Sequence, residues 1–373
     1  MNRRAVVCGG RPTAIGVVVP LLRSAGYEVT LLSERTALPN DAVVRRLGVE
    51  TLPLTGLGCR QWGTPEAADA VAQADLLLTD TTREEWPGML SSLVGGLKLR
   101  WQRGEASPLV LCCEGGPGPH KRLKVELQDA LGREGQEAVE GMTTVQCLLE
   151  GRAVETADGW VAEADGALLV DGETLADWQG TPVTPVRPFA LALERYILLE
   201  RTGERLAAHL GVAAGCRTLS QTLENDKAAA ILMKALAEAC RALAAKHGLV
   251  PEDGALWAER WAARYREPAF DWECAALCRD PLDLIDRNGP LVQAIHLSLK
   301  QKGKPVYLSA ALAAVFLWDD ADDPSSQRMR EFIRKKGIGK ALDKLCGLGI
   351  RTQPHWWAVE FYKAFRAGAL TRN

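Results

Sequence analysis

The fold is decided by Ala5-Val6-Val7-Cys8-Gly9-Gly10-Arg11-Pro12-Thr13-Ala14, a short apolar run followed by two glycines. An apolar helical pattern follows from Ile15 to Ala25, and a second apolar run at 28–32 predicts another strand. A buried strand, a glycine turn and a helix, in this order, begin a Rossmann-type βαβ unit. The stretch therefore predicts a sheet with a loop at the end of its first strand.

Strands alternate with helices through the first half of the chain. Apolar runs predict strands at 75–79 and 108–113, and helical patterns lie around 65–73 and 86–103. Such alternation indicates an α/β fold with a doubly wound parallel sheet. Residues 145–180 lose the alternation, and their short strand-like pieces predict antiparallel additions to the sheet.

A proline-rich stretch, Pro182-Val183-Thr184-Pro185-Val186-Arg187-Pro188, ends this pattern and is expected to break regular structure. Beyond it the periodicity is helical nearly to the end of the chain, with an amphipathic stripe over 225–248. We therefore expect two domains. Residues 1–186 form a Rossmann-type dinucleotide-binding domain, and residues 187–373 form an all-helical substrate domain.

Composition limits the function classes. Of the 373 residues 47% are hydrophobic and 25% charged, and the net charge of -2 gives no reason to expect nucleic acid or a membrane surface as a partner. Ten cysteines without a signal peptide predict reduced thiols and a cytoplasmic protein. Cys274 and Cys278 share a helix face, but no further ligands lie nearby in sequence, so we expect no metal. The expected partner is a small-molecule ligand, and the chain is a monomer or a dimer.

Several short motifs follow one another along the chain. They are Cys113-Glu114 before Leu123-Lys124, Asn225-Asp226-Lys227 before Lys246-His247-Gly248, Arg264-Tyr265-Arg266-Glu267-Pro268, Arg279-Asp280-Pro281-Leu282, and Asp322-Asp323-Pro324. Their order and spacing resemble the mannitol-1-phosphate 5-dehydrogenase family and the wider polyol-specific long-chain dehydrogenases. The resemblance implies an oxidoreductase that transfers a hydride between an alcohol and NAD or NADP.

The helix that the resemblance makes catalytic has changed at three positions. In the family it reads roughly E-R-K-L-F-T-L-N-T-G-H, where the Lys is the general base and the Asn and His hold the alcohol oxygen. Here Thr202-Gly203 set the register, and these positions fall on Tyr196, Arg201 and Glu204. At about 100° per residue Tyr196, Glu200 and Glu204 would share one face. Either Tyr196 replaces the base, with Arg201 stabilising its phenolate, or these side chains form an ordinary solvated helix face.

The glycine loop also departs from the family, which writes it G-A-G-N-I-G. In the frame Gly9-Gly10-Arg11-Pro12-Thr13-Ala14, the first glycine is kept for the tight turn, and alanine is an accepted substitute for the third. Arg11 stands at the second, where its side chain crowds the cofactor's phosphates unless it pairs with one of them. Pro12 removes one backbone N–H that could face an anion.

The end of the second predicted strand bears on the choice of cofactor. Ser33 takes the position of the usual ribose-binding acid, and Arg35 lies beside it, a combination that suits a 2′-phosphate. Glu34 argues the other way. We therefore take Gly9, Gly10, Arg11, Ala14, Ser33 and Arg35 as candidate cofactor residues. Binding of NAD or NADP and retention of the loop as mere scaffold stay equal alternatives.

The resemblance also implies substrate contacts at Glu114, Asp283 and Arg287. The family's basic pair has become Asp283-Leu284, and an Asp-Arg pair has become Gly289-Pro290. An anionic sugar phosphate would meet Asp283 in place of a cation, so mannitol 1-phosphate is not the expected substrate. Two functions remain. One is a polyol dehydrogenase-type oxidoreductase with a rewired active site, and the alternative is a catalytically silent relative that acts as a binding or regulatory protein.

Overall fold

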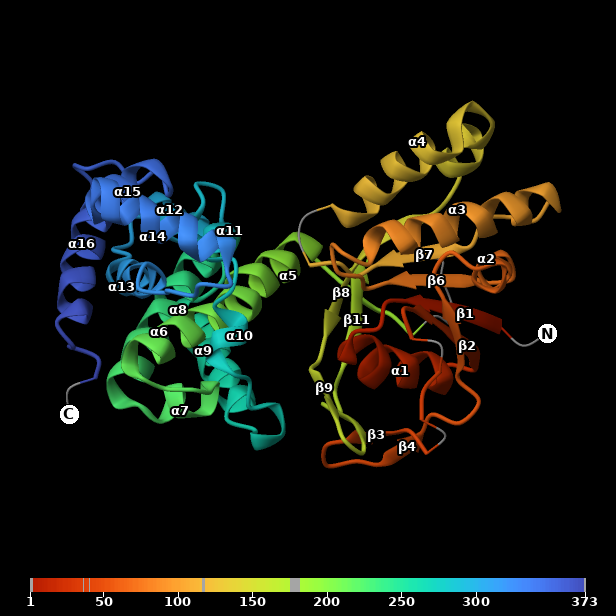
Figure 1. The fold of residues 1–373 in the computed structure, drawn as a ribbon, viewed down its shortest axis with the longest axis horizontal. Helices are drawn as coiled ribbons and strands as arrows, with labels where there is room; N and C mark the ends of the chain where they lie inside the picture. The colour runs from red at the N-terminus through yellow and green to blue at the C-terminus, as the bar shows by residue number, and fades with distance from the viewer. Residues whose placement is uncertain (1–2, 36, 40, 116–117, 175–181, 372–373) are drawn as a thin grey trace. The chain divides into compact units, whose positions relative to one another are not determined.

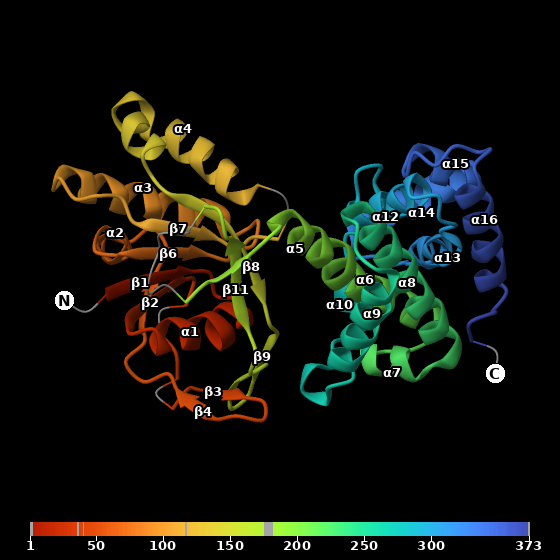
Figure 2. The ribbon, with the colours of Figure 1, turned by 180° about the vertical axis from the view of Figure 1, so that it is seen from behind.

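The structure is a computed structural model that describes residues 3–35, 37–39, 41–115, 118–174 and 182–371. The chain divides into two compact units, Met1–Ala190 and Leu191–Asn373. Figures 1 and 2 show that strands and helices build the first unit and helices the second. The α/β architecture predicted from the sequence is confirmed.

The first unit is built on an eight-stranded sheet, in the order β12-β11-β8-β7-β6-β1-β2-β5 among the described residues. Its strands are β1 (Arg3–Cys8), β2 (Tyr27–Ser33), β5 (Gly58–Gln61), β6 (Leu76–Thr79), β7 (Leu109–Cys112), β8 (Thr144–Glu150), β11 (Ala167–Asp171) and β12 (Thr184–Val186). From β5 to β8 all neighbours pair in parallel. Taken in chain order, these six strands follow the 3-2-1-4-5-6 arrangement of a Rossmann sheet.

The antiparallel pieces predicted for residues 145–180 are present: β11 runs antiparallel to β8, and β9 runs antiparallel to β10. The latter two belong to a separate four-stranded sheet in the order β4-β3-β10-β9, in which β3 and β10 are parallel. Its strands are β3 (Val43–Arg46), β4 (Thr51–Pro53), β9 (Ala153–Thr156) and β10 (Gly159–Ala162). The prediction that the proline-rich stretch breaks regular structure is wrong for β12, which pairs with β11. Pro185 is tolerated there because β12 is an edge strand, where one side of the backbone needs no partner.

Helices cover both faces of the main sheet (Figure 1). They are a π-helical turn η1 (Ala14–Val18), α1 (Val19–Ser24), α2 (Pro65–Ala72), α3 (Trp86–Gln102) and α4 (Pro119–Glu140). Successive strand residues enter opposite cores: Ala5 and Val7 pack with η1 and α1, whereas Val6 and Cys8 pack with α2, α3 and α4. The central strands β6 and β7 are buried along their whole length, which is why their sequences read as continuous apolar runs.

The second unit is helical. Its helices are α5 (Phe189–Arg195, which begins at the end of the first unit), the π-helical turn η2 (Tyr196–Arg201), α6 (Thr202–Ala214), α7 (Leu219–Glu224), α8 (Asp226–His247), α9 (Pro251–Tyr265), the 3-10 turn η3 (Pro268–Phe270), α10 (Cys274–Leu277), α11 (Pro281–Ile285), α12 (Pro290–Lys300), α13 (Val306–Val315), α14 (Pro324–Lys336), α15 (Ile338–Lys344) and α16 (Gln353–Arg366). Within the described part of this unit the β-pairing is limited to one isolated bridge, Thr218 with Glu273.

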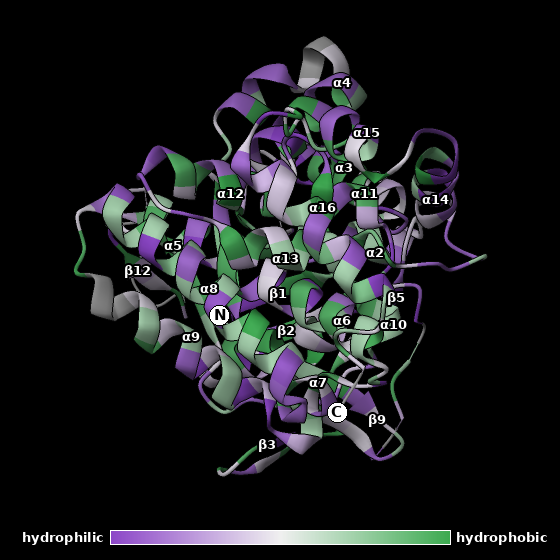
Figure 3. Cartoon of the chain, turned by 90° about the vertical axis from the view of Figure 1, so that its left-hand side faces the viewer, coloured by the Kyte–Doolittle hydropathy of each residue, from purple (hydrophilic) through white to green (hydrophobic). Residues whose placement is uncertain are grey.

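One continuous hydrophobic core supports these helices. The stripe predicted on α8 is buried at Leu232, Leu236 and Leu243. Hydrophilic and hydrophobic residues follow one another along the helices of both units (Figure 3), the pattern of helices with one buried and one solvated face. Among the described helices none combines the length and the hydropathy that a membrane span needs.

The turn after β1 forces a glycine at position 9. Gly9 has φ +133°, a conformation that side chains disfavour, and its N–H donates to the Leu32 carbonyl at 2.9 Å. A Cβ built on Gly9 would lie 2.1 Å from the carbonyl oxygen of Asp80, which follows β6. Backbone, not a movable side chain, fills that space, so the first two strands and β6 can meet here only if residue 9 has no side chain.

We predict that Gly9→Ala destabilises the first unit by at least about 2 kcal/mol, because the substitution adds both backbone strain and a clash with a carbonyl group. Urea unfolding monitored by tryptophan fluorescence measures the change. Gly104→Ala is the matched control, since Gly104 also has a positive φ (+72°) but a Cβ there meets nothing within 4 Å. Equal effects of the two substitutions would contradict the steric argument.

Candidate functional site

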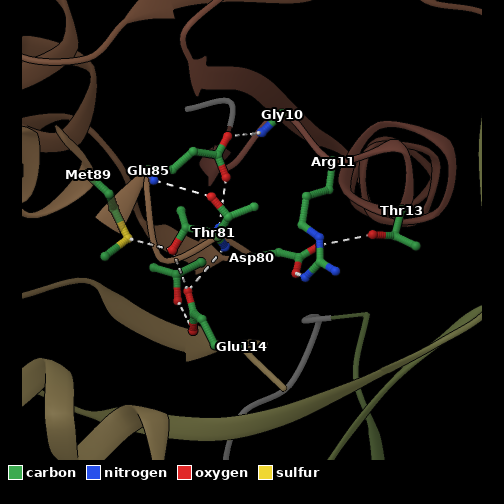
Figure 4. Close-up of polar contacts among 10 residues, drawn as sticks. Gly10, Arg11, Thr13, Asp80, Thr81, Glu85, Met89 and Glu114 are labelled. Atoms are coloured by element: carbon green, nitrogen blue, oxygen red, sulfur yellow. Dashed lines mark hydrogen bonds and ion pairs between the residues drawn. The ribbon is translucent and has the colours of Figure 1, made fainter. Parts of the chain in front are cut away.

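The carboxyl ends of β1, β6 and β7 meet at one edge of the main sheet, the edge at which open α/β sheets bind ligands. The strand register places Cys8 beside Thr79, and Thr79 beside Cys112. Residues just past these strand ends contact one another, as Figure 4 shows. We call this group the sheet-edge cluster; its members are Gly10, Arg11, Thr13, Thr79, Asp80, Thr81, Thr82, Glu85 and Glu114.

Glu85 ties the glycine loop to the start of α3. One carboxylate oxygen accepts the Thr82 N–H at 2.8 Å, and the Glu85 N–H donates to the Thr82 hydroxyl at 3.2 Å. This reciprocal exchange has the pattern of a capping box, formed by the turn that leads into α3. The other carboxylate oxygen accepts the Gly10 N–H at 3.3 Å. The backbone donor that the glycine loop would offer to a ligand is therefore bound by the chain itself.

Arg11 is also engaged within the cluster. Its guanidinium donates to one oxygen of Asp80 at 3.0 Å, and the Thr13 hydroxyl donates to the other oxygen at 3.0 Å. The Asp80 side chain is only 3% exposed, whereas that of Arg11 is 34% exposed. Arg11 therefore neutralises a buried carboxylate, and a phosphate could use it only in competition with Asp80.

Glu114, a predicted substrate residue, belongs to the same cluster. Its carboxylate accepts hydrogen bonds from the hydroxyls of Thr79 and Thr81, at 2.8 and 3.0 Å, and from the Thr81 N–H at 3.3 Å. Burial raises the pKa of Glu114, and the nearby charge of Asp80 also raises it. Together with Glu85, three carboxylates line this edge of the sheet.

The residues at the end of β2 are Ser33 and, just beyond it, Arg35, whose charge is paired outside the sheet-edge cluster. The Ser33 side chain is buried, and its hydroxyl accepts the Arg35 N–H at 3.1 Å. The Arg35 guanidinium donates two hydrogen bonds to the carboxylate of Glu155 in β9, and the one from Nη1 to Oε1 measures 2.8 Å. Its Cζ atom lies 5.8 Å from the centre of the Trp160 ring. The hydrogen bond to Glu155 raises the pKa of Arg35. The arginine predicted to meet a 2′-phosphate thus already has an acidic partner.

The helix after the loop packs closely at a glycine that the motif did not single out. Ala14, at the predicted third glycine position, is fully buried at the start of η1. Two residues later, a Cβ built on Gly16 would lie 2.6 Å from the Cβ of Ala153 and 3.3 Å from that of Ala162. The close approach of this helix to the small sheet therefore depends on Gly16, which the sequence analysis missed.

In the second unit, the helix predicted to be catalytic contains a π-helical turn. This turn, η2, spans Tyr196–Arg201, and the Thr202 hydroxyl donates to the carbonyl of Ile197, five residues earlier, at 2.7 Å. A π-helical turn is closed by hydrogen bonds between residues i and i+5, so successive side chains are separated by a smaller rotation about the helix axis than in an α-helix. The expectation that Tyr196, Glu200 and Glu204 recur at regular α-helical spacing is corrected accordingly. Tyr196 is half-buried and Arg201 exposed.

Helix α9 holds the two carboxylates of this segment. Arg264 pairs with Glu200 at 3.2 Å, and the Tyr265 hydroxyl donates to Glu204. The ring of Tyr265 stacks on Trp261 with 4.2 Å between centroids. This oxygen of Glu204 is therefore engaged as a hydrogen-bond acceptor, whereas the family's histidine provides a donor.

Asp283 and Arg287 lie on the exposed surface of α11 and just after it. Arg205 of α6 donates to the carbonyls of Arg279 and Asp280, at 2.7 and 2.8 Å, and burial lowers its pKa, an effect that the charge of Asp283 opposes. The Nε atom of Arg287 lies 2.7 Å from the position of a Cβ built on Gly347, so its side chain packs against that glycine. Arg205, which the sequence analysis did not single out, is thus engaged with backbone carbonyls, and the predicted Arg287 packs against Gly347.

The cysteines within the described residues are free thiols, nine of them buried. Burial raises the pKa of Cys274 to about 11, which keeps this thiol protonated near neutral pH. No group of three His, Cys, Asp or Glu side chains that could hold a metal ion occurs in the described part of the chain.

Known proteins resemble this chain over nearly its whole length, although no family model matches it. It is 25% identical over 368 residues to mannitol-1-phosphate 5-dehydrogenase of Brevibacillus brevis, covering 92% of this chain and 93% of the relative. The same enzyme of Bacillus pumilus is 24% identical, with 89% and 92% covered. Mannitol 2-dehydrogenase of Pseudomonas fluorescens, solved as a ternary complex with NAD and D-mannitol, has the same fold: the TM-score is 0.74 at 12% identity, over 99% of this chain and 93% of that one.

The resemblance predicted from the sequence motifs is therefore confirmed: the chain has mannitol-1-phosphate 5-dehydrogenases as homologues and shares the fold of the polyol-specific long-chain dehydrogenases. What the sequence analysis missed are Asp80, Glu85, Glu155 and Tyr265, the partners of the predicted residues. The only signal in the sequence was the T-x-x-E spacing of Thr82 and Glu85, which indicates a helix start.

The buried carboxylate of Glu114 generates a pH prediction. Because its folded-state pKa is raised above the ordinary value of 4.5, its stabilising contribution is complete below pH 4.5 and is lost as pH rises through the folded-state pKa. Glu114→Gln keeps the shape of the protonated acid and removes this loss. We expect the stability of the variant relative to the natural protein to increase as pH rises above 4.5, measured by urea unfolding at a series of pH values. Glu28→Gln, at an exposed position on β2, is the control; a pH-independent difference for Glu114→Gln would contradict the assignment.

Proposed function

We propose that the chain is an NAD(H)-dependent oxidoreductase of the polyol dehydrogenase type with a rewired active site, and that it does not act on mannitol 1-phosphate. The observation that carries the proposal is the full-length similarity to mannitol-1-phosphate 5-dehydrogenases, which extends through both units. The Gly9 turn at the end of β1 supports it, since that backbone geometry is what a dinucleotide loop needs.

The backbone of the glycine loop is suited to a dinucleotide, whereas the side chains around it disfavour one. Gly9 keeps the tight turn that such a loop needs, whereas the second glycine position, where the backbone approaches a pyrophosphate, is occupied by Arg11. Against this, Asp80 and Glu85 place carboxylates beside the same turn. When bound, a nicotinamide cofactor would accept or donate the hydride. We propose that Gly9, Gly10 and Ser33 contribute to its site.

For the proton transfer we propose Tyr196. Oxidation of an alcohol needs a base for the hydroxyl proton, and a cation beside a phenol lowers its pKa towards the useful range. Arg201, at the other end of the same π-helical turn, is the proposed cation. Glu204 is held as an acceptor by Tyr265 and so takes no part in donating to the alcohol oxygen. Tyr196 would then remove the proton while Arg201 holds the developing negative charge.

A substrate assay tests the change of specificity. Because Asp283 replaces a cation of the family and Arg205 is engaged with backbone carbonyls, mannitol 1-phosphate and fructose 6-phosphate should give no turnover with NAD(H) or NADP(H). Absorbance of the reduced nicotinamide measures this, with a mannitol-1-phosphate dehydrogenase as the positive control. Sustained oxidation of mannitol 1-phosphate that disappears in Tyr196→Phe would show that the rewiring has been misjudged, while supporting Tyr196 as the base.

We propose NAD(H) over NADP(H) because Arg35 is paired with Glu155. A 2′-phosphate would have to take the guanidinium away from a carboxylate that holds it at two points. Glu155→Gln should therefore improve the affinity for NADPH relative to NADH by roughly tenfold, measured by nicotinamide fluorescence. Asp158→Asn, an equal charge change at an exposed position between β9 and β10, is the control. An unchanged ratio in Glu155→Gln would exclude Arg35 as the 2′-phosphate ligand.

A second candidate function has its own support. In the glycine loop, the Gly10 N–H is bound by Glu85 and the Arg11 guanidinium by Asp80, so both are satisfied without a ligand. This is what a catalytically silent relative that retains the fold for binding or regulation would show. Titration with NADH discriminates the two: saturable binding favours the oxidoreductase, and its absence for all four nicotinamide cofactors favours the silent relative.

A further inference from the structure

Glu85 makes more contacts than a helix cap requires. A capping box uses one carboxylate oxygen and the backbone N–H of the same residue, and Glu85 has both in its exchange with Thr82. The second oxygen crosses to the Gly10 N–H, 75 residues away in sequence. In Figure 4 the Glu85 carboxylate lies between Gly10 and the other members of the sheet-edge cluster. The contact to Gly10 is therefore a separate feature, independent of the cap.

The second oxygen of Glu85 occupies a donor that a phosphate ligand would use. In a Rossmann loop the backbone N–H groups after the first strand are the donors for an anionic pyrophosphate. Here a carboxylate oxygen, also an anionic acceptor, is bound to such a donor. A Cβ built on Gly10 would lie 3.8 Å from the same oxygen, so the carboxylate sits directly against the loop.

Arg11 does not offset this negative charge, because Asp80 has already taken its guanidinium. Asp80 in turn is buried and binds Thr13 as well. Asp80 and Arg11 together are neutral, so the negative charge that an incoming phosphate meets at the Gly10 N–H is that of Glu85. Like charges repel one another at close range.

We infer that Glu85 is an internal competitor for the phosphate-binding loop: its carboxylate holds the Gly10 N–H that a dinucleotide's pyrophosphate needs, and this competition sets the affinity and selectivity of the site. The inference rests on the proposed function. It makes Glu85 a specificity residue that discriminates against ligands by their phosphate charge. A ligand without phosphate does not compete with it.

Neutralising Glu85 without disturbing the helix start tests this inference. Glu85→Gln retains the capping box, since glutamine serves equally at this position, and removes only the charge. We expect NADH to bind the variant roughly ten- to a hundredfold more tightly than the natural protein, the difference that a charge-assisted hydrogen bond makes. ADP should gain similarly, whereas adenosine, which lacks phosphate, should bind both proteins equally. Isothermal titration measures all three.

Glu84→Gln is the matched control, because Glu84 precedes Glu85 and is fully exposed. It makes the same change in net charge and should leave the affinities unchanged. Thermal unfolding of all variants establishes that they are folded. Equal gains in Glu84→Gln and Glu85→Gln would assign the effect to the general field and overturn the competition at Gly10.

Two further outcomes separate this inference from the proposed function. If the natural protein and Glu85→Gln bind NADH with the same measurable affinity, the competition is refuted and the dinucleotide site stands. If folded Glu85→Gln and the natural protein both fail to bind NADH and ADP, the dinucleotide site itself is refuted, and the inference falls with it.

Discussion

The contact between Gly9 and Asp80 is the constraint on which the sheet-edge cluster depends. The Asp80 N–H donates to the Cys8 carbonyl at 2.8 Å, and its own carbonyl fills the space where residue 9 would carry a side chain. This brings the Asp80 carboxylate under the loop, buried, where its charge needs partners. Arg11 and Thr13 supply them. Loss of Arg11 would leave the buried Asp80 carboxylate without its cationic partner, so Arg11 has a structural role whatever else the loop does.

Sequence patterns predicted the large elements of the fold because their signals are local. The strands at the centre of the sheet are buried on both faces, and each reads as one continuous apolar run, such as Leu76–Thr79. The small sheet has strands of three or four residues with no periodicity to detect, and β12 lies in a proline-rich stretch that a central strand could not tolerate. The π-helical turn at Tyr196–Arg201 was also invisible, since it changes the spacing of hydrogen bonds more than the hydrophobic pattern.

The sequence predicted the candidate site only where the local backbone conformation demands one particular residue. Gly9 could be assigned from the strand–glycine–helix pattern, because its backbone geometry excludes other residues. The partners that decide what the site does lie far away in sequence: 69 residues separate Arg11 from Asp80, and 61 separate Glu204 from Tyr265. No local pattern links such pairs. The T-x-x-E motif indicates the start of α3, but it does not predict that the second carboxylate oxygen of Glu85 accepts a hydrogen bond from the Gly10 N–H.

Charged side chains of the candidate sites already have partners of opposite charge. Arg11 is matched by Asp80, Arg35 by Glu155 and Glu200 by Arg264, each within its own unit. A polar group that would otherwise wait for a ligand is thereby satisfied in the protein alone, which removes the cost of burying it unpaired. A ligand must then replace an internal contact with its own. Only the difference in free energy between the two contacts contributes to its affinity.

The two kinds of ligand differ in what they can replace. A diphosphate brings two charges and several oxygens against the single Glu85 carboxylate. A sugar phosphate near Asp283 meets an exposed carboxylate and Arg205, which is already bound to backbone carbonyls. In the function that we propose, this balance favours exchange at the nucleotide loop over recognition of an anionic sugar, so that the cofactor is retained while the substrate changes.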